Sequence, residues 1–114
     1  MLEYIHIDLS TNDHITILVG QNAKENWQLI DSSSQNDIWL HLGSGLPSPH
    51  VVIKVPENIT ISKSTIKYGA VLCKSHSSYK SISKVTVIYT NIKNVTKSQI
   101  VGSVTTKKIK KIVL

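Results

Sequence analysis

The side chains best suited to chemistry in this chain are one indole, two imidazoles and one ammonium group that lie close together in the sequence. In the segment IWLHL, strand alternation would place Trp39 and His41 on the same face. In the segment HVVIKV, it would place His50 and Lys54 on the same face. If the two strands pair, these four side chains share one surface, which would suit a polyanion that carries flat bases.

Nucleic-acid binding is therefore the first interpretation of this surface. Trp39 would be a platform for base stacking, a contact that contributes about 1–3 kcal/mol per base. His41, Ser48 and His50 would supply hydrogen bonds, and lysines would contact phosphates. A core position for Trp39 under a helix fits the sequence equally well. The complete set of expected nucleic-acid-binding residues is Asn22, Lys24, Asn26, Trp39, His41, Ser48, His50, Lys54, Lys74, Lys93 and Lys97.

Two other functions fit some of the same residues. An enzyme acting on RNA would use His41 and His50 as general acid and base, but no carboxylate is placed to orient them and no hydrolase or transferase motif is present. The two histidines alone fall short of a metal site, although Asp37 could join them. A protein-interaction module would dock its basic part onto an acidic partner or a ribosomal protein. We expect a binding protein without catalytic residues, metal or cofactor.

Charge is distributed unevenly along the chain. The formal net charge is +6, yet all seven carboxylates lie in residues 1–57, whereas residues 58–114 hold eleven of the thirteen lysines. A basic half of this kind favours contact with phosphates or with an acidic partner; protection of edge strands is the alternative. Because the chain has no arginine, bidentate reading of guanine is excluded, and lysines favour backbone contacts without sequence preference.

Length and composition indicate one domain, residues 1–114, with a single core. No segment reaches the roughly 18 consecutive apolar residues of a membrane span. No signal peptide is evident, and the single cysteine, Cys73, excludes an internal disulfide. We therefore expect a cytoplasmic protein, and exposed hairpin edges leave its oligomeric state open.

The hydrophobic pattern predicts an α+β fold, with a mixed or mostly antiparallel sheet, one short helix and one long helix. A hairpin is expected over residues 2–19. The short helix would follow, with Asn22 as its N-cap and free backbone N–H groups that could seat a phosphate. The long helix would run from about residue 62 to residue 77, with Gly69 and Cys73 on its buried face. Further strands are expected over residues 84–90, 100–105 and 109–114, and a turn-rich stretch over 91–97.

With these elements in place, the sequence resembles the NFACT-R domain, also called the NFACT RNA-binding domain. The likeness rests on the segments VGQN, DIWLH, SPHVVI and VTVIYT, in that order, and on VGSV with the basic strand after it. It spans nearly the whole chain. The spacing of the D-x-W-x-H segment to H-V-V is its most specific element. Pro49 is a departure, because the family usually has Gly, Ser or Ala before this histidine.

The resemblance implies an NFACT-R domain that stands alone and binds nucleic acid. The family includes ribosome-associated quality-control factors that bind tRNA on the large ribosomal subunit. RNA, either tRNA or rRNA, is therefore the first expected partner, and DNA and the ribosome itself are further candidates. The peptide-tailing activity of the long family members is not carried over to this chain.

The charge distribution leads to a first prediction. RNA binding should weaken steeply as salt rises, because each neutralised phosphate releases condensed counterions and adds to the slope of log affinity against log salt. A titration of a fluorescent single-stranded RNA at several salt concentrations measures this slope. A flat dependence on salt would contradict phosphate binding by the lysines.

Overall fold

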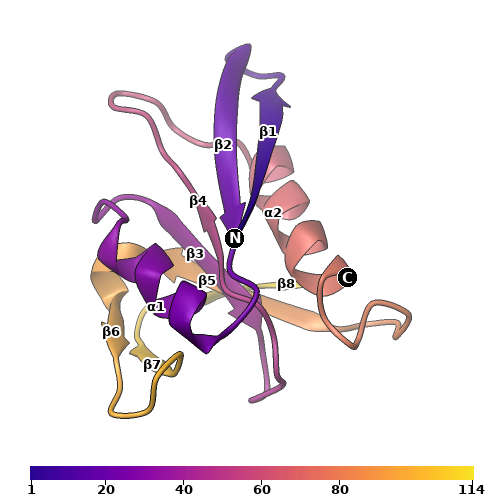
Figure 1. Ribbon diagram of the computed structural model, residues 1–114. Helices are drawn as coiled ribbons and strands as arrows, with labels where there is room; N and C mark the ends of the chain where they lie inside the picture. The colour runs from indigo at the N-terminus through magenta and orange to yellow at the C-terminus, as the bar shows by residue number, and fades with distance from the viewer.

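A twisted six-stranded sheet runs through the computed structural model, which describes residues 1–114 (Figure 1). Its strand order is β1-β2-β4-β3-β5-β8, and β6 and β7 form a separate two-stranded ribbon. All strand pairs are antiparallel, which confirms the α+β prediction and sharpens it. The elements in chain order are β1 (Leu2–Asp8), β2 (Asp13–Val19), α1 (Ala23–Asp31), β3 (Ile38–Leu42), β4 (Val51–Ile53), α2 (Lys63–Ser75), β5 (Thr86–Asn91), a 3-10 helix η1 (Ile92–Asn94), β6 (Val95–Lys97), β7 (Val104–Thr106) and β8 (Lys110–Val113).

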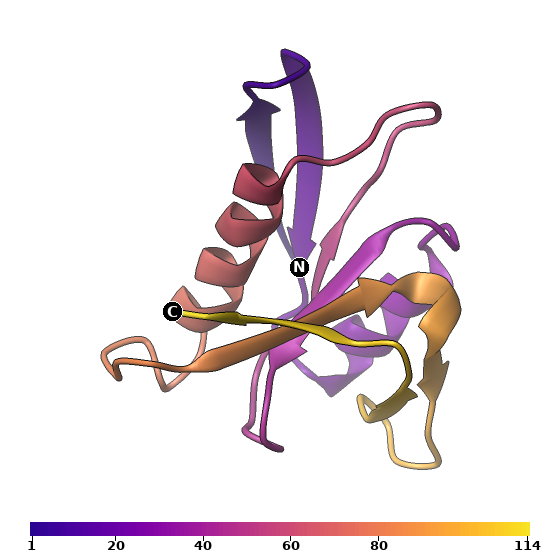
Figure 2. The same cartoon turned by 180° about the vertical axis from the view of Figure 1, so that it is seen from behind.

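The two faces of the sheet are covered by different elements. α1 lies toward the viewer in Figure 1, and α2 lies toward the viewer in Figure 2. Val95 and Val104 of the β6–β7 ribbon pack in the same small cluster as Leu29 of α1. Strand alternation sends Ile38, Leu40 and Leu42 of β3 into the core under α2, whereas Trp39 belongs to a smaller cluster under α1. The central strands β3 and β4 are therefore buried on both faces.

The core under α2 is the larger of the two. It joins apolar side chains from β2, β3, β4 and β5 to the small residues of the helix. Gly69 brings α2 close to the sheet, because a β-carbon there would lie 2.9 Å from Cδ1 of Ile53. Ala70 and Cys73 are fully buried on the same face, as the sequence pattern predicts.

A buried carboxylate joins the β1–β2 hairpin to the start of α2. Asp8 accepts hydrogen bonds from the Ser10 hydroxyl, the Ser62 amide and the Thr65 hydroxyl. These bonds, led by that from Ser10, hold the pKa of the Asp8 carboxyl well below its usual range. Ser62 is also the N-cap of α2, so the hairpin and the helix start are fixed by one network.

The expected elements and the observed ones differ mainly near the C-terminus. The long helix ends two residues early, at Ser75, and the predicted strand over residues 100–105 is wrong over its first four residues. Residues 100–103 form a turn in which Gly102 has a φ of +85°, a left-handed conformation that favours glycine. The stretch expected to be a turn, residues 91–97, contains η1 and the short strand β6.

No helix has the length and apolar composition that crossing a membrane requires.

The close approach of α2 leads to a second prediction. Gly69→Leu should lower the free energy of unfolding by about 1–3 kcal/mol, because the added side chain overpacks the contact with Ile53. Val71→Leu adds bulk to the same helix at a side chain that is 44% exposed, so it serves as the control. Urea denaturation of both variants gives the comparison. Equal stability of the two variants would show that α2 does not lie this close to the sheet.

Candidate nucleic-acid interface

The pairing of β3 with β4 brings the two histidines of the sequence motif together. Trp39 lies opposite Val52, and the same register places His41 opposite His50, just outside the paired residues. The His41 ring stacks on Trp39 with centroids 5.5 Å apart, and the His50 ring meets both edge-on at 5.4 Å and 5.2 Å. These three side chains therefore lie together on one face of the sheet, as the sequence predicts.

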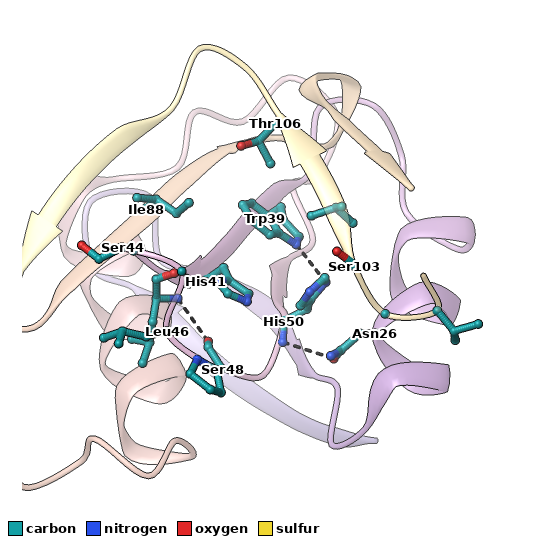
Figure 3. A pocket seen from close by; sticks show the side chains of 17 residues that line it. Asn26, Trp39, His41, Ser44, Leu46, Ser48, His50, Ile88, Ser103 and Thr106 are labelled. Carbon is teal, nitrogen blue, oxygen red and sulfur yellow. Dashed lines mark hydrogen bonds between the residues drawn. The ribbon is translucent and has the colours of Figure 1, made fainter. Parts of the chain in front are cut away.

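Trp39 is a core residue and not a platform for bases. Its side chain is 1% exposed, with one ring face against His41, and its Nε1 donates a hydrogen bond to Nδ1 of His50 at 3.1 Å (Figure 3). The stacking role expected from the sequence is wrong, because the indole is buried and the His41 ring already stacks on one of its faces. Trp39 instead holds His50 in place.

Hydrogen bonds fix which ring nitrogens carry protons. Because Nδ1 of His50 accepts from the indole, the neutral His50 ring carries its proton on Nε2. Nδ1 of His41 lies 2.6 Å from the carbonyl oxygen of Leu42, which can only accept, so His41 is protonated at Nδ1. His50 therefore keeps an N–H donor at Nε2, whereas Nε2 of His41 is unprotonated and can accept a hydrogen bond.

Burial lowers the pKa of both imidazoles, which favours their neutral forms. Burial, and then repulsion from the neighbouring His41 ring, lower the pKa of His50 to about 3. Burial also lowers the pKa of His41, and the bond to the Leu42 carbonyl opposes this shift. The pair therefore acts in hydrogen bonding and not as a cationic anchor for phosphate.

Asn26 of α1 secures the backbone at His50. Its Oδ1 accepts from the His50 amide at 3.2 Å, and its Nδ2 makes no hydrogen bond within the chain. Gly20 makes room for this contact, because a β-carbon there would lie 2.2 Å from the same oxygen. The backbone of Gly20 also donates to the His50 carbonyl at 2.9 Å. The two peptide groups of the motif histidine are thus held by Gly20 of the V-G-x-N segment and by Asn26, four residues after that segment.

Ser48 closes the loop that connects the two motif strands. Its hydroxyl accepts from the Leu42 amide at 3.1 Å, donates to the Pro49 carbonyl at 2.7 Å, and contacts Sγ of Cys73 at 3.2 Å. Burial raises the pKa of the Cys73 thiol to about 11, so this sulfur is a protonated packing group. Ser48 therefore shapes the loop, as a structural hydrogen-bonding group.

The β6–β7 ribbon forms the far wall of the site. Gly102 lies against the first turn of α1, since a β-carbon there would be 2.7 Å from Ala23. Nε1 of Trp27 donates to the Ser103 carbonyl at 3.0 Å and ties the ribbon to the same helix. These ribbon residues are absent from the predicted site, although the VGSV segment signalled them.

The result is a cavity of about 530 Å³, here called the histidine pocket (Figure 3). It contains no lysine and no carboxylate, and it is open between the β3–β4 loop and the ribbon. Five of the predicted residues line it together, and the lining set is Asn26, Trp39, His41, Leu42, Gly43, Ser44, Gly45, Leu46, Pro47, Ser48, His50, Ile88, Val101, Gly102, Ser103, Val104 and Thr106.

The predicted lysines lie outside this pocket, and two of them are paired with carboxylates. Lys54 contacts Asp37 at 3.3 Å and donates to the Ser32 carbonyl at the end of α1, where a cation is favoured. Lys97 contacts Asp31 at 2.7 Å. The expectation that Lys54 joins the motif surface is wrong, because a buried carboxylate draws its ammonium group away.

The other predicted cationic and helix-end positions are dispersed. Lys74 donates to the Leu114 carbonyl, while Lys24 and Lys93 are exposed and make no side-chain bond. Asn22 is the N-cap of α1, as predicted, and accepts from the Glu25 amide. The Glu25 carboxylate already accepts a hydrogen bond at this helix end and places a negative charge there. This charge makes the helix end less favourable for binding a phosphate.

Asp37, the acidic residue of the motif, has a structural role. Its two oxygens accept from the Ser34 and Val55 amides at 2.9 Å, and they face Lys54. No group of three or more His, Cys, Asp or Glu side chains in the chain is arranged to hold a metal ion.

A comparison with known protein families identifies the domain that carries this geometry. The model described as "NFACT protein RNA binding domain" matches residues 2–108. This chain belongs to the NFACT RNA-binding domain family. The resemblance inferred from the motif segments is confirmed, and the D-x-W-x-H and H-V-V segments of the NFACT domain are the two strands that meet at the histidine pocket.

This NFACT domain matches part of two longer chains. It is 38% identical over 84 residues to the "Rqc2 homolog RqcH" of Bacillus subtilis (strain 168), a match that covers 73% of this chain and 14% of that protein. The solved structure of the C-terminal part of the fibronectin/fibrinogen-binding protein from Streptococcus suis has the same fold, with a TM-score of 0.81 at 23% identity. That match covers 100% of this chain and 45% of the other.

The assigned proton positions lead to a third prediction. Long-range ¹H–¹⁵N NMR spectra should show His50 as the Nε2–H tautomer and His41 as the Nδ1–H tautomer, and His50 should stay neutral at pH 5. A titration midpoint for His50 near 6.5, the ordinary value, would contradict the buried bond with Trp39.

Stability should follow the same titration. Because the folded pKa of His50 is lowered, the unfolded chain binds the extra proton, so the full stability is present above about pH 6.5 and is lost as the pH falls toward 3. Between pH 7 and pH 5 the loss due to His50 should be about 2 kcal/mol. The variant His50→Gln, measured by urea denaturation at both values, should lose less over this interval than the original chain.

Proposed function

We propose that this NFACT domain binds RNA without catalysing a reaction, and that the histidine pocket receives one unstacked nucleobase. The family match supports RNA as the ligand. The similarity to the Rqc2 homolog RqcH supports a role in ribosome-associated quality control. Within this proposal, the bound RNA is tRNA or rRNA and the location is the cytoplasm. DNA is a weaker candidate, because the family match names RNA.

The observation that carries this proposal is the donor and acceptor pair inside the pocket. Nε2–H of His50 and the bare Nε2 of His41 belong to rings whose centroids are 5.2 Å apart. The edges of nucleobases present donors and acceptors side by side, and RNA recognition in single-stranded regions reads such edges. A base could accept from His50 and donate to His41, while Ile88 and Val104 contact its ring.

The pocket suits a neutral ring better than a phosphate. It has no lysine or arginine, and burial lowers the pKa of both imidazoles, which favours their uncharged forms. A volume of about 530 Å³ lies within the range of pockets that take small ligands, which is roughly 300–1,000 Å³. The phosphates of the same strand would remain outside, where the lysines are.

The chemistry of the nearby side chains supports binding without catalysis. A general acid at neutral pH needs a pKa near 7, and His50 lies far below that value. The Ser48 hydroxyl donates to a carbonyl and has no base beside it, and the Cys73 thiol has a raised pKa. Neither oxygen nor sulfur is activated as a nucleophile.

A fourth prediction tests the base-binding role. His41→Phe keeps a ring against Trp39 but removes the acceptor, so affinity for a mixed-sequence single-stranded RNA should fall about tenfold, as expected for one lost hydrogen bond of about 1.4 kcal/mol. Because no charge is lost, the slope of log affinity against log salt should not change. Fluorescence anisotropy at several salt concentrations measures both quantities.

The matched control is His14→Phe, which makes the same substitution on β2, outside the pocket. It should bind RNA as the original chain does. Unchanged affinity in His41→Phe would show that RNA binds elsewhere on the domain. If the original chain does not bind RNA at all, but binds an acidic peptide, the protein-interaction interpretation replaces the proposed function.

A further inference from the structure

Two adjoining hollows lie on the opposite side of the sheet from the histidine pocket, between α2 and the β5–β8 pair. Their volumes are about 360 Å³ and 340 Å³, and both are lined by Ile66 of α2 and Tyr89 of β5. Figure 2 shows α2 and β8 on the near side of the molecule, and the β6–β7 ribbon at the lower right, below β8. Together the two hollows form one continuous surface, which we call the lysine groove.

Five lysines surround this groove, and no carboxylate lines it. Lys63 and Lys67 come from α2, and the others come from η1, β8 and the turn before it; the second group is Lys93, Lys108 and Lys110. All five side chains are exposed, and none forms an ion pair. The groove therefore concentrates positive charge that the chain does not neutralise.

The two α2 lysines of the groove, Lys63 and Lys67, lie at positions that are electrostatically unfavourable in a helix. Lys63 lies in the first turn, which contains no acidic residue, and the positive end of the helix dipole repels a cation there. Lys67 follows four residues later, on the same side of the helix, and like charges at this spacing repel each other. A bound polyanion would relieve both repulsions.

A buried polar network sets the opposite rim. The Thr90 hydroxyl lies 3.2 Å from the carbonyl oxygens of Lys107 and Lys108, and Asn94 donates to the same hydroxyl at 3.0 Å. The Lys107 amide donates to the Asn94 carbonyl at 3.1 Å. These bonds hold Lys108 at a φ of 55°, an uncommon conformation for a residue with a side chain. The turn that carries the lysines is therefore fixed before any ligand binds.

The floor of the groove contains an aromatic ring. Tyr89 is half-buried, its hydroxyl makes no hydrogen bond within the chain, and no other ring stacks on it. Surfaces that bind single-stranded nucleic acid combine a positively charged track for phosphates with an aromatic ring for a base. This combination favours RNA over an acidic peptide, which needs the charges but not the ring.

We infer that the lysine groove is a second RNA-binding surface, which takes the sugar–phosphate backbone of a single-stranded segment. The identity of the ligand rests on the proposed function, whereas the location does not. Ile88 lines the histidine pocket and Tyr89 lines the groove, so neighbouring residues of β5 serve the two surfaces. An RNA that fills both surfaces passes around the edge strand β8.

The double variant Lys67→Gln/Lys110→Gln tests the groove. If each lysine neutralises one phosphate, the slope of log affinity against log salt for single-stranded RNA should become shallower by about 1.4. The control, Lys80→Gln/Lys84→Gln, removes the same charge from exposed lysines that line none of the cavities, and its slope should match that of the original chain. Binding of the RNA should also protect Lys67 and Lys110 from an amine-reactive reagent.

The outcomes separate this inference from the proposed function. Equal slopes for the two double variants, with RNA binding intact and reduced by His41→Phe, would overturn the lysine groove and leave the histidine pocket in place. Loss of slope in Lys67→Gln/Lys110→Gln, with no effect of His41→Phe, would support the groove and overturn the pocket. Protection of the two lysines by an acidic peptide but not by RNA would overturn the groove as an RNA site.

Discussion

The hydrogen bond from Trp39 Nε1 to His50 Nδ1 is the contact on which the site depends. Both groups are buried, and an unpaired donor or acceptor at this depth would cost about 1–3 kcal/mol. The bond joins the second residue of β3 to the residue that precedes β4 and fixes the tautomer of His50. His41 stacks on the same indole, so its position follows from that of Trp39. The D-x-W-x-H and H-V-V segments thus pack as a single unit. Trp39 holds both histidines in position, and the two histidines line the pocket.

The part of the site that depends on strand periodicity could be predicted from the sequence. Alternation alone places Trp39 and His41 on one face, and antiparallel pairing then brings His50 beside them. The fate of the lysines could not be predicted in the same way. Their long flexible stems reach whichever carboxylate or carbonyl the fold brings near, and these partners are far away in the sequence. Lys54 and Lys97 are neutralised by Asp37 and Asp31, 17 and 66 residues away.

The β6–β7 ribbon shows a different limit of sequence interpretation. Its strands are three residues each and pair only with one another, so they carry too few residues for a clear periodic signal. Their position comes from tertiary contacts, namely Gly102 against Ala23 and Ser103 bonded to Trp27. The VGSV segment was informative as part of the family likeness, although its strand boundaries were wrong. The fold class, the hairpin and both helices were predicted because their patterns are local and long enough to read.

The position of β5 between the histidine pocket and the lysine groove restricts how this domain can diverge. Successive side chains of a strand face opposite ways, so inserting or deleting a single residue before Ile88 would exchange the inward and outward positions of the rest of the strand. The isoleucine would then face the cationic side and the tyrosine the neutral side, and both surfaces would change in one event. Relatives can therefore be expected to vary in the identity of side chains along β5 but to conserve its length, and to place their insertions in the connecting loops.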